Sequence, residues 1–171
     1  MSGTVVIVPF EDRHAADFDR LNRAWLEAYG LLEKDDEPHL RDPRASIVDG
    51  GGALFIATLD GAVVGSCGVH PSGEGAFEIV KLAVDESARG HGLGRRLTER
   101  AVGFARDAGA RKVTLLSSHR LESALRLYES LGFRRLPMPA GVGYETADVY
   151  MELDLGSSSP PIPPAPLPPP G

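Results

Sequence analysis

Residues 78–94 read EIVKLAVDESARGHGLG, and the rest of the chain is organised around this stretch. Its first part, extended back to Phe77, is mostly apolar and β-branched, which predicts a strand buried on both faces. A short polar turn follows, and the glycine-rich run from Arg89 to Gly94 leads into a helical pattern that begins near Leu93. This succession predicts a phosphate-binding loop, because unpaired backbone N–H groups and the helix dipole favour an anion there.

The glycine spacing narrows the choice of phosphate ligand. The dinucleotide fingerprint G-x-G-x-x-G fails, because counting from Gly90 places Arg95 at the last glycine position, and the G-K-[ST] of the P-loop is absent. The run fits R-x-x-G-x-G instead, with Arg89, Gly92 and Gly94 at the fixed positions. Arg89 can fork onto phosphate oxygens. The competing interpretation at this point is a turn that needs glycine only for its positive φ angles.

Composition and charge exclude several classes of protein. The chain has 171 residues, of which 42% are apolar and 25% charged, as is typical of a soluble globular domain. A net charge of −6 argues against nucleic acid as a partner. No apolar run reaches the ~20 residues of a membrane span, and we expect neither a membrane segment nor a signal peptide. The single cysteine, Cys67, indicates a reducing cytoplasm, and the five scattered histidines predict no metal site.

Hydrophobic periodicity predicts the element order β-α-loop-β-β-β-α-β-α-β-β. Asp60 and Gly61 form the two-residue signal of a β-hairpin, and residues 77–116 form a βαβ unit. Residues 31–44, which contain two prolines, are predicted to be a loop with one helical turn. The predicted strands are 4–8, 53–59, 62–70, 77–84, 112–116, 133–136 and 146–155, and the predicted helices are 14–29, 93–108 and 121–131.

The end of the chain differs in composition from the rest. Residues 156–171 read GSSSPPIPPAPLPPPG and hold eight of the fourteen prolines and no charge. Such a run cannot build a core and predicts a disordered, extended tail. We therefore expect one folded domain over residues 1–155 and a proline-rich tail over 156–171.

A second motif follows the glycine-rich loop. Ala124 begins the pattern A-x-x-L-Y-x-x-x-G-F, in which Tyr128 is the tyrosine and Phe133 the last position. Together, in this order and at this separation, the two motifs resemble those of the GNAT superfamily of acetyl-CoA-dependent N-acetyltransferases. The resemblance covers roughly residues 4–155. The strand sequence that begins at Glu78 is similar to that of the histone-acetyltransferase branch of this superfamily.

The resemblance implies an α/β (α+β) fold: a mixed, mostly antiparallel sheet with a central βαβ unit and helices on both faces. It implies acetyl-CoA as co-substrate, Glu78 as general base and Tyr128 as the acid for the departing thiolate. Many members carry an asparagine where this chain has Leu121, so Ser118 and His119 are the nearby polar substitutes for that contact. The implied coenzyme contacts are Leu82, Ala83, Val84, Arg89, Gly90, His91, Gly92, Leu93, Gly94, Arg95, Ser118 and Tyr128.

The chemistry of acetyl transfer sets three requirements. The attacking amine must be neutral, although an alkyl ammonium has a pKa near ~10.4. Glu78 can take its proton, and burial in an apolar strand should raise the pKa of that carboxyl. A backbone N–H near Ala83 or Val84 can meet the oxyanion if the strand is splayed or bulged there. Alternative interpretations are an ion pair of Glu78 with Lys81, a base role for Glu74, and a purely packing role for Tyr128.

The acceptor is the least determined part of the prediction. In the superfamily it is shaped by segments equivalent to residues 25–44 and 137–145 of this chain. We expect a small primary amine or an amino-acid-like acceptor, with a protein lysine or N-terminus as the alternative. A non-catalytic acyl-CoA-binding module and a nucleotide-binding α/β domain are the rival functions. An exposed edge strand would allow a homodimer.

Overall fold

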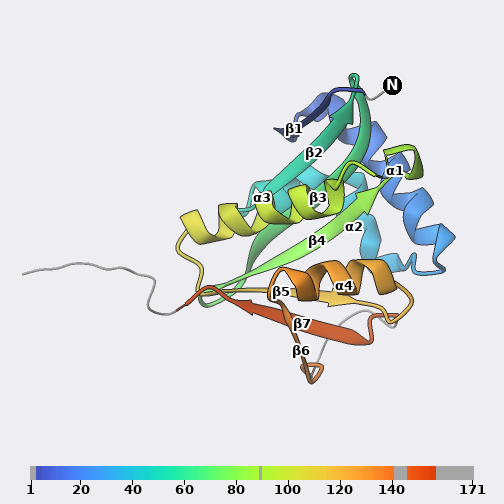
Figure 1. Cartoon of the computed structure of the whole chain (residues 1–171). Coiled ribbons are helices and arrows are strands. Elements are labelled where there is room, and N and C mark those ends of the chain that lie inside the picture. The colour runs from blue at the N-terminus through green and yellow to red at the C-terminus, as the bar shows by residue number, and fades with distance from the viewer. Residues whose placement is uncertain (1–2, 89, 141–145, 157–171) are drawn as a thin grey trace, which may run out of the picture.

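A computed structural model gives the structure of the chain and describes residues 3–88, 90–140 and 146–156. Seven strands form one sheet in the order β1-β2-β3-β4-β5-β7-β6 (Figure 1). Every neighbouring pair is antiparallel except β4 and β5, which are parallel. The predicted mixed, mostly antiparallel sheet is confirmed. The tail residues 157–171, and with them the predicted disorder, lie outside the described part of the chain.

The helices cover both faces of the sheet. One core lies under α3 and α4 and contains Leu97, Leu125 and Met151. The other lies under α1 and α2 and contains Phe18 and Leu40. Figure 1 shows these two pairs of helices on opposite faces of the strands. None of the described helices has the length and apolar character that a membrane crossing requires.

The N-terminal part follows the predicted order, β1 (Val5–Pro9) and then α1 (Ala15–Ala28), with a 3-10 turn η1 (Asp12–His14) between them. Gly30, just past the helix, has a φ of 68°. Its N–H donates to Glu27 O at 3.1 Å, so Gly30 stops the helix as predicted.

The segment after α1 is more helical than predicted. It contains η2 (Lys34–Asp36), α2 (Glu37–Arg41) and a π-helical turn η3 (Arg44–Val48). The two prolines do not break these elements, because Pro38 lies in the first turn of α2 and Pro43 precedes η3. At the start of a helix the missing N–H of proline costs no intrahelical hydrogen bond. The prediction of a loop with one helical turn is therefore wrong.

The long hairpin of β2 (Ala53–Leu59) and β3 (Ala62–Gly73) has the predicted two-residue turn. Asp60 and Gly61 have φ angles of 51° and 88°, as a type I′ turn requires. β3 runs three residues further than predicted and turns into β4 (Ala76–Val84).

The βαβ unit consists of β4, α3 (Leu93–Asp107) and β5 (Lys112–Ser117), with a 3-10 turn η4 (Glu86–Ala88) before the helix. Leu97, Ala101 and Ala105 are fully buried and hold α3 against the sheet. The chain continues through α4 (Glu122–Ser130), β6 (Arg134–Leu136) and β7 (Val149–Asp154). β7 lies between β5 and β6 and is shorter than the predicted strand 146–155.

The central strand β4 is not buried on both faces as its apolar run predicts. Ala76, Ile79 and Ala83 are its buried residues, and the others are partly exposed. The cause lies in the geometry of this strand: β4 bulges at Lys81 and separates from β5 after Ile79. Both features shape the site described next.

Candidate active site

The two parallel strands at the centre of the sheet separate from each other. The ladder between β4 and β5 joins residues 76–79 to residues 112–115 and ends there. Beyond that point β4 stays paired with β3 as far as Val84, while β5 stays paired with β7 as far as Ser117. A gap therefore opens between the strands, and one edge of β4 is not covered by a strand. The splay on which the predicted oxyanion donor depends is present.

A bulge in β4 accompanies this gap. Val80 pairs with Gly68 and Ala83 with Ser66, so β4 has one residue more than β3 over this interval. Lys81 is in the left-handed region, with a φ of 55°. Its carbonyl accepts a hydrogen bond from Ser66 Oγ at 2.7 Å, and Ser66 Oγ in turn accepts one from Asn22 Nδ2 at 3.0 Å. Buried polar groups on α1 and β3 thus hold the bulge in place.

The glycine-rich turn leads directly into α3. Gly90 and Gly92 have φ angles of 92° and 66°, and Gly92 is the N-cap. The first intrahelical bond runs from Arg96 N to Gly92 O, so the N–H groups of residues 93–95 have no acceptor within the helix. A Cβ at Gly90 or Gly92 would meet no heavy atom within 4 Å, so the space before the turn is open. Glycines with positive φ and a helix N-terminus that could receive an anion therefore coincide here.

A groove of about 500 Å³ extends from this turn along β4 to α4. It contains most of the predicted coenzyme contacts: Leu82, Ala83, Val84, Gly90, Gly92, Leu93 and Gly94. Arg95 is directed to α4 instead, where its Nη2 donates to Ser130 Oγ at 2.6 Å. His91 is not among the residues that line the groove. Arg89 lies outside the described residues.

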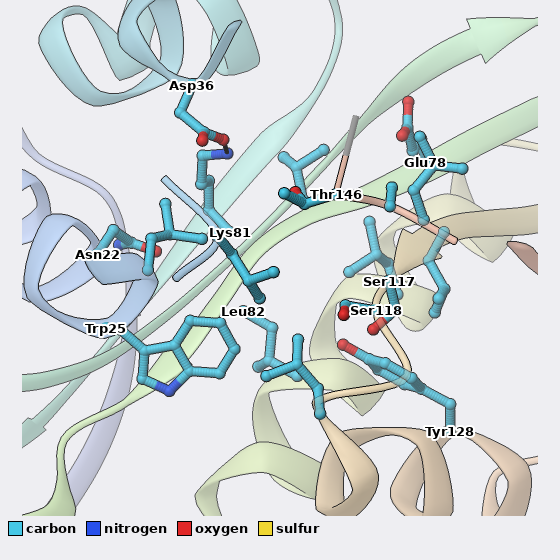
Figure 2. Close-up of a pocket in the computed structure, with 18 residues that line it drawn as sticks. Asn22, Trp25, Asp36, Glu78, Lys81, Leu82, Ser117, Ser118, Tyr128 and Thr146 are labelled. Carbon is cyan, nitrogen blue, oxygen red and sulfur yellow. Dashed lines mark hydrogen bonds and ion pairs between the residues drawn. The ribbon is translucent and has the colours of Figure 1, made fainter. Parts of the chain in front are cut away.

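A smaller cavity of about 130 Å³ lies beside the gap between β4 and β5. Glu78 and Tyr128, the predicted base and acid, both line it, from β4 and α4 respectively (Figure 2). Trp25, Leu82 and Leu121 line this cavity and the groove alike. The groove and the cavity therefore meet at the gap between the strands.

Glu78 lies in a largely apolar part of the cavity wall. Burial raises the pKa of its carboxyl, and the nearby His70 and Lys81 lower it in part. His70 Nε2 is 3.9 Å from Glu78 Oε1. The alternative ion pair with Lys81 does not form, because Lys81 Nζ lies 2.6 Å from Asp36 Oδ1. Glu74, the alternative base, is exposed in the turn between β3 and β4.

Tyr128 is buried on α4, and its ring packs against Phe133 with the centroids 5.7 Å apart. Figure 2 shows its hydroxyl directed toward Ser117 and Ser118. Burial raises the pKa of the phenol, so Tyr128 keeps its proton at physiological pH and can donate a hydrogen bond. The packing role and the cavity-lining role of this tyrosine are thus compatible.

Ser118 lines the small cavity and not the groove. Its hydroxyl oxygen accepts a hydrogen bond from Arg120 N at 3.1 Å. Arg120 Nη1 reaches Tyr29 O at 3.2 Å, so this turn is attached to the end of α1. The structure therefore places Ser118 beside Tyr128 and not along the predicted coenzyme groove.

A third cavity, of about 520 Å³, lies on the other side of Glu78. Its polar lining comes from the end of β3, from the turn that follows it, from β5 and from β7: Ser72, Glu74, Lys112, Thr114 and Tyr150. Tyr150 Oη donates to Glu152 Oε2 at 2.5 Å, and Lys112 Nζ lies 3.2 Å from the same oxygen. Because Glu78 lines this cavity as well as the small one, the carboxyl can be reached from the side away from the glycine-rich turn.

Sequence reasoning missed several residues of the site. Asp36 and Ser66 are buried polar residues that contact Lys81 in the bulge, and the buried Asn22 contacts Ser66. The signal for Asn22 is a polar residue on the apolar face of α1, whereas nothing distinguishes Asp36 from the other charges of residues 33–37. Within the described part of the chain, no three histidine, cysteine or acidic residues are grouped so that they could hold a metal ion.

The chain is similar in sequence to known proteins. The family model described as "Acetyltransferase (GNAT) family" matches residues 18–133. A mycothiol acetyltransferase of Thermomonospora curvata is 39% identical over 121 residues, which cover 66% of this chain and 40% of that protein. The chain spans about half the length, or less, of the curated relatives that it matches first.

Solved structures share the fold at low sequence identity. A GNAT acetyltransferase from Staphylococcus aureus superposes with a TM-score of 0.82 at 16% identity, covering 90% of this chain and 100% of that one. The yncA protein of Salmonella typhimurium, solved with its cofactor acetyl-CoA, gives a TM-score of 0.68 at 21% identity and covers 93% and 98%.

Proposed function

Because the chain belongs to the GNAT family of acetyltransferases, we propose that it transfers an acetyl group from acetyl-CoA to a primary amine. The observation that carries this proposal is the meeting of two spaces at the gap between β4 and β5. The groove from the glycine-rich turn ends there, and so does the cavity that holds Glu78 and Tyr128. A thioester extended along the groove would reach both side chains.

The groove fits the chemistry of acetyl-CoA. A pyrophosphate needs several N–H donors that point the same way, and the first turn of α3 offers those of residues 93–95. It also needs close approach to the backbone, which the absent Cβ atoms of Gly90 and Gly92 allow. An arginine at position 89 would add a cation beside this seat.

Glu78 would take the proton of the acceptor amine. A general base works best when its pKa is near the working pH, and burial moves the pKa of this carboxyl upward from the range of an exposed glutamate. The carboxylate form is present above that pKa. We therefore infer that the rate falls as the pH drops through the pKa of Glu78.

The uncovered edge of β4 would stabilise the developing oxyanion. Asp85 N donates to Val64 O on β3 at 2.8 Å. Because successive N–H groups of a strand point to opposite edges, that of Ala83 faces β3 and that of Val84 faces the gap. We therefore favour Val84 of the two predicted donors. The Tyr128 hydroxyl, which keeps its proton, would donate to the departing thiolate.

The acceptor that we propose is a small molecule or an amino-acid-like amine that attacks directly in a ternary complex. The two cavities at Glu78 leave room for an amine while the groove is occupied. One relative is named a mycothiol acetyltransferase, which favours a small-molecule acceptor over a protein. The alternative acceptor is a protein lysine or N-terminus.

The test is a thiol-release screen over amino acids, polyamines, aminoglycosides and lysine peptides, with calorimetric titration of coenzyme A alongside. Turnover on a small amine supports the proposal, and turnover on lysine peptides alone favours the protein-directed alternative. Coenzyme A binding without turnover on any amine would indicate an acyl-CoA-binding module. Preferential binding of NAD would contradict the groove assignment.

A further inference from the structure

His70 stands directly across from Glu78 in the ladder between β3 and β4. Its Nδ1 lies 3.0 Å from Pro71 O, and its Nε2 lies 3.9 Å from Glu78 Oε1. A carbonyl oxygen only accepts hydrogen bonds, so Nδ1 must carry the hydrogen. In the neutral ring Nε2 therefore bears the lone pair. The contact with the Pro71 carbonyl thus fixes the tautomer that presents a proton acceptor to Glu78.

Among the described residues, the titratable groups on α2 that face His70 do not compete with Glu78 for its Nε2. The ring of His39 on α2 packs against it with the centroids 5.8 Å apart. Burial, with smaller effects of Lys81 and His70, lowers the pKa of His39 to about 4, so His39 is neutral near pH 7. Behind His39 lie Lys81 and Asp36, which pair with each other. Glu78 is therefore the group with which His70 can exchange a proton.

The proposed reaction leaves a proton on Glu78 that must depart before the next turnover. The acceptor amine would occupy the cavity side of this carboxyl, where the proton arrives. His70 approaches from β3, and its side chain is 22% exposed, close to the 24% of Glu78, so the ring gives the proton a second way to solvent while the amine occupies the cavity. The 3.9 Å separation exceeds a direct hydrogen bond, but one water molecule or a rotation of the carboxyl can close it.

We propose that His70 acts through Glu78 as a proton relay. Its Nε2 receives the proton that Glu78 takes from the amine and passes it to solvent. This inference rests on the proposed acetyl transfer. The proton moves from the amine to a Glu78 oxygen, then to Nε2 to give an imidazolium, and finally from Nε2 to water. The ring returns to the neutral tautomer with Nδ1–H on the Pro71 carbonyl, and no other group changes its charge.

Two variants separate this role from a structural one. His70→Asn can keep a donor for the Pro71 carbonyl, and His70→Gln can keep a polar group near Nε2, but neither side chain titrates. For both we expect kcat to fall about tenfold at pH 8, where a neutral imidazole can accept the proton, and less at pH 5, where an imidazolium cannot. The loss is smaller than the ~10²–10⁴ of a direct general base because Glu78 remains. Added imidazole should restore most of the rate in both variants and leave the wild type unchanged.

The controls separate failure of this inference from failure of the proposed function. Coenzyme A binding by calorimetry should be unchanged in both variants, because His70 is not among the residues of the groove. A Glu78→Gln variant should be nearly inactive, with no response to imidazole. If it is inactive while both His70 variants keep the wild-type pH profile, the role of His70 is refuted and the acetyl transfer stands. An equal loss at every pH with no imidazole rescue also refutes it. A wild-type protein that turns over no amine refutes the proposed function itself.

Discussion

The glycine-rich turn allows a test in which stability and coenzyme binding should respond differently to one methyl group. In Gly92→Ala the new Cβ would meet no heavy atom within 4 Å, so no clash is expected in the free protein. The backbone, however, has a φ of 66°, and an L-residue in the left-handed region costs about 1–2 kcal/mol. We therefore expect a loss of about that size in the free energy of unfolding.

The affinity for coenzyme A should also fall, for a reason separate from the strain in the backbone. The methyl group would enter the open space before the first turn of α3, where we place the pyrophosphate, and would hold the phosphates away from the N–H groups of residues 93–95. A loss of at least tenfold in affinity, or about 1.4 kcal/mol, is expected for Gly92→Ala. For Gly92→Glu we expect no measurable binding, because a carboxylate would fill the seat with like charge.

Gly103 provides the matched control. It also has open space at its Cβ position, but it lies within α3 and is not among the positive-φ glycines. Gly103→Ala should therefore stabilise the protein by about 0.5–1 kcal/mol and leave binding unchanged. Urea denaturation and calorimetric titration at a temperature well below unfolding measure the two quantities separately. If Gly92→Glu binds coenzyme A as tightly as Gly103→Ala does, the turn is not the pyrophosphate site.

Three further predictions concern the cavity. Glu78→Gln should lower kcat about 10²–10⁴-fold. It should also abolish the decline of kcat/KM at low pH, because in the wild type this decline follows protonation of the Glu78 carboxylate. An unchanged pH profile would mean that another residue is the base. Tyr128→Phe keeps the packing on Phe133, so the melting temperature should change little while turnover falls about tenfold or more. Unaltered turnover would mean that Tyr128 has only a packing role. Lys81→Met should destabilise the fold by about 3–5 kcal/mol in denaturant titrations, because it leaves Asp36 buried without its ammonium partner. Adding Asp36→Asn to this variant should recover part of the loss. If Lys81→Met alone is as stable as the wild type, the ion pair does not contribute to stability.

Local patterns in the sequence predicted the elements that depend on local chemistry. The dipeptide at residues 60 and 61 makes the hairpin, and Gly30 stops α1, because both positions need positive φ. The two motifs of the second half place Gly92 and Tyr128 on opposite sides of one gap in the sheet. These features follow from residues close together in the chain, which is why a single sequence contains enough information to predict them.

The bulge in β4 could not be predicted in the same way. Lys81 reads as an ordinary residue of an apolar strand, and its left-handed conformation depends on partners far away in the sequence. Ser66 is 15 residues away and Asp36 is 45. Asn22 reaches Ser66 across 44 residues. Periodicity reports which face a side chain occupies only while the strand stays regular, so it failed where the strand is interrupted.

The interruption of β4 explains why a polar network lies beneath an apolar strand. A parallel pair of strands that stayed in register would satisfy the N–H of Val84 and leave no donor for an oxyanion. Separating the strands leaves that N–H uncovered but removes neighbouring contacts, and the bulge beside the gap places Lys81 in a conformation that costs about 1–2 kcal/mol. The hydrogen bonds from Ser66 to the Lys81 carbonyl and from Asn22 to Ser66, with the pair that Lys81 forms with Asp36, offset this cost. If the network serves to keep the gap open, Ser66→Ala should weaken turnover more than it weakens coenzyme binding. The proposed donor at Val84 lies beyond the bulge on β4, whereas the turn that we propose for the diphosphate leads into α3.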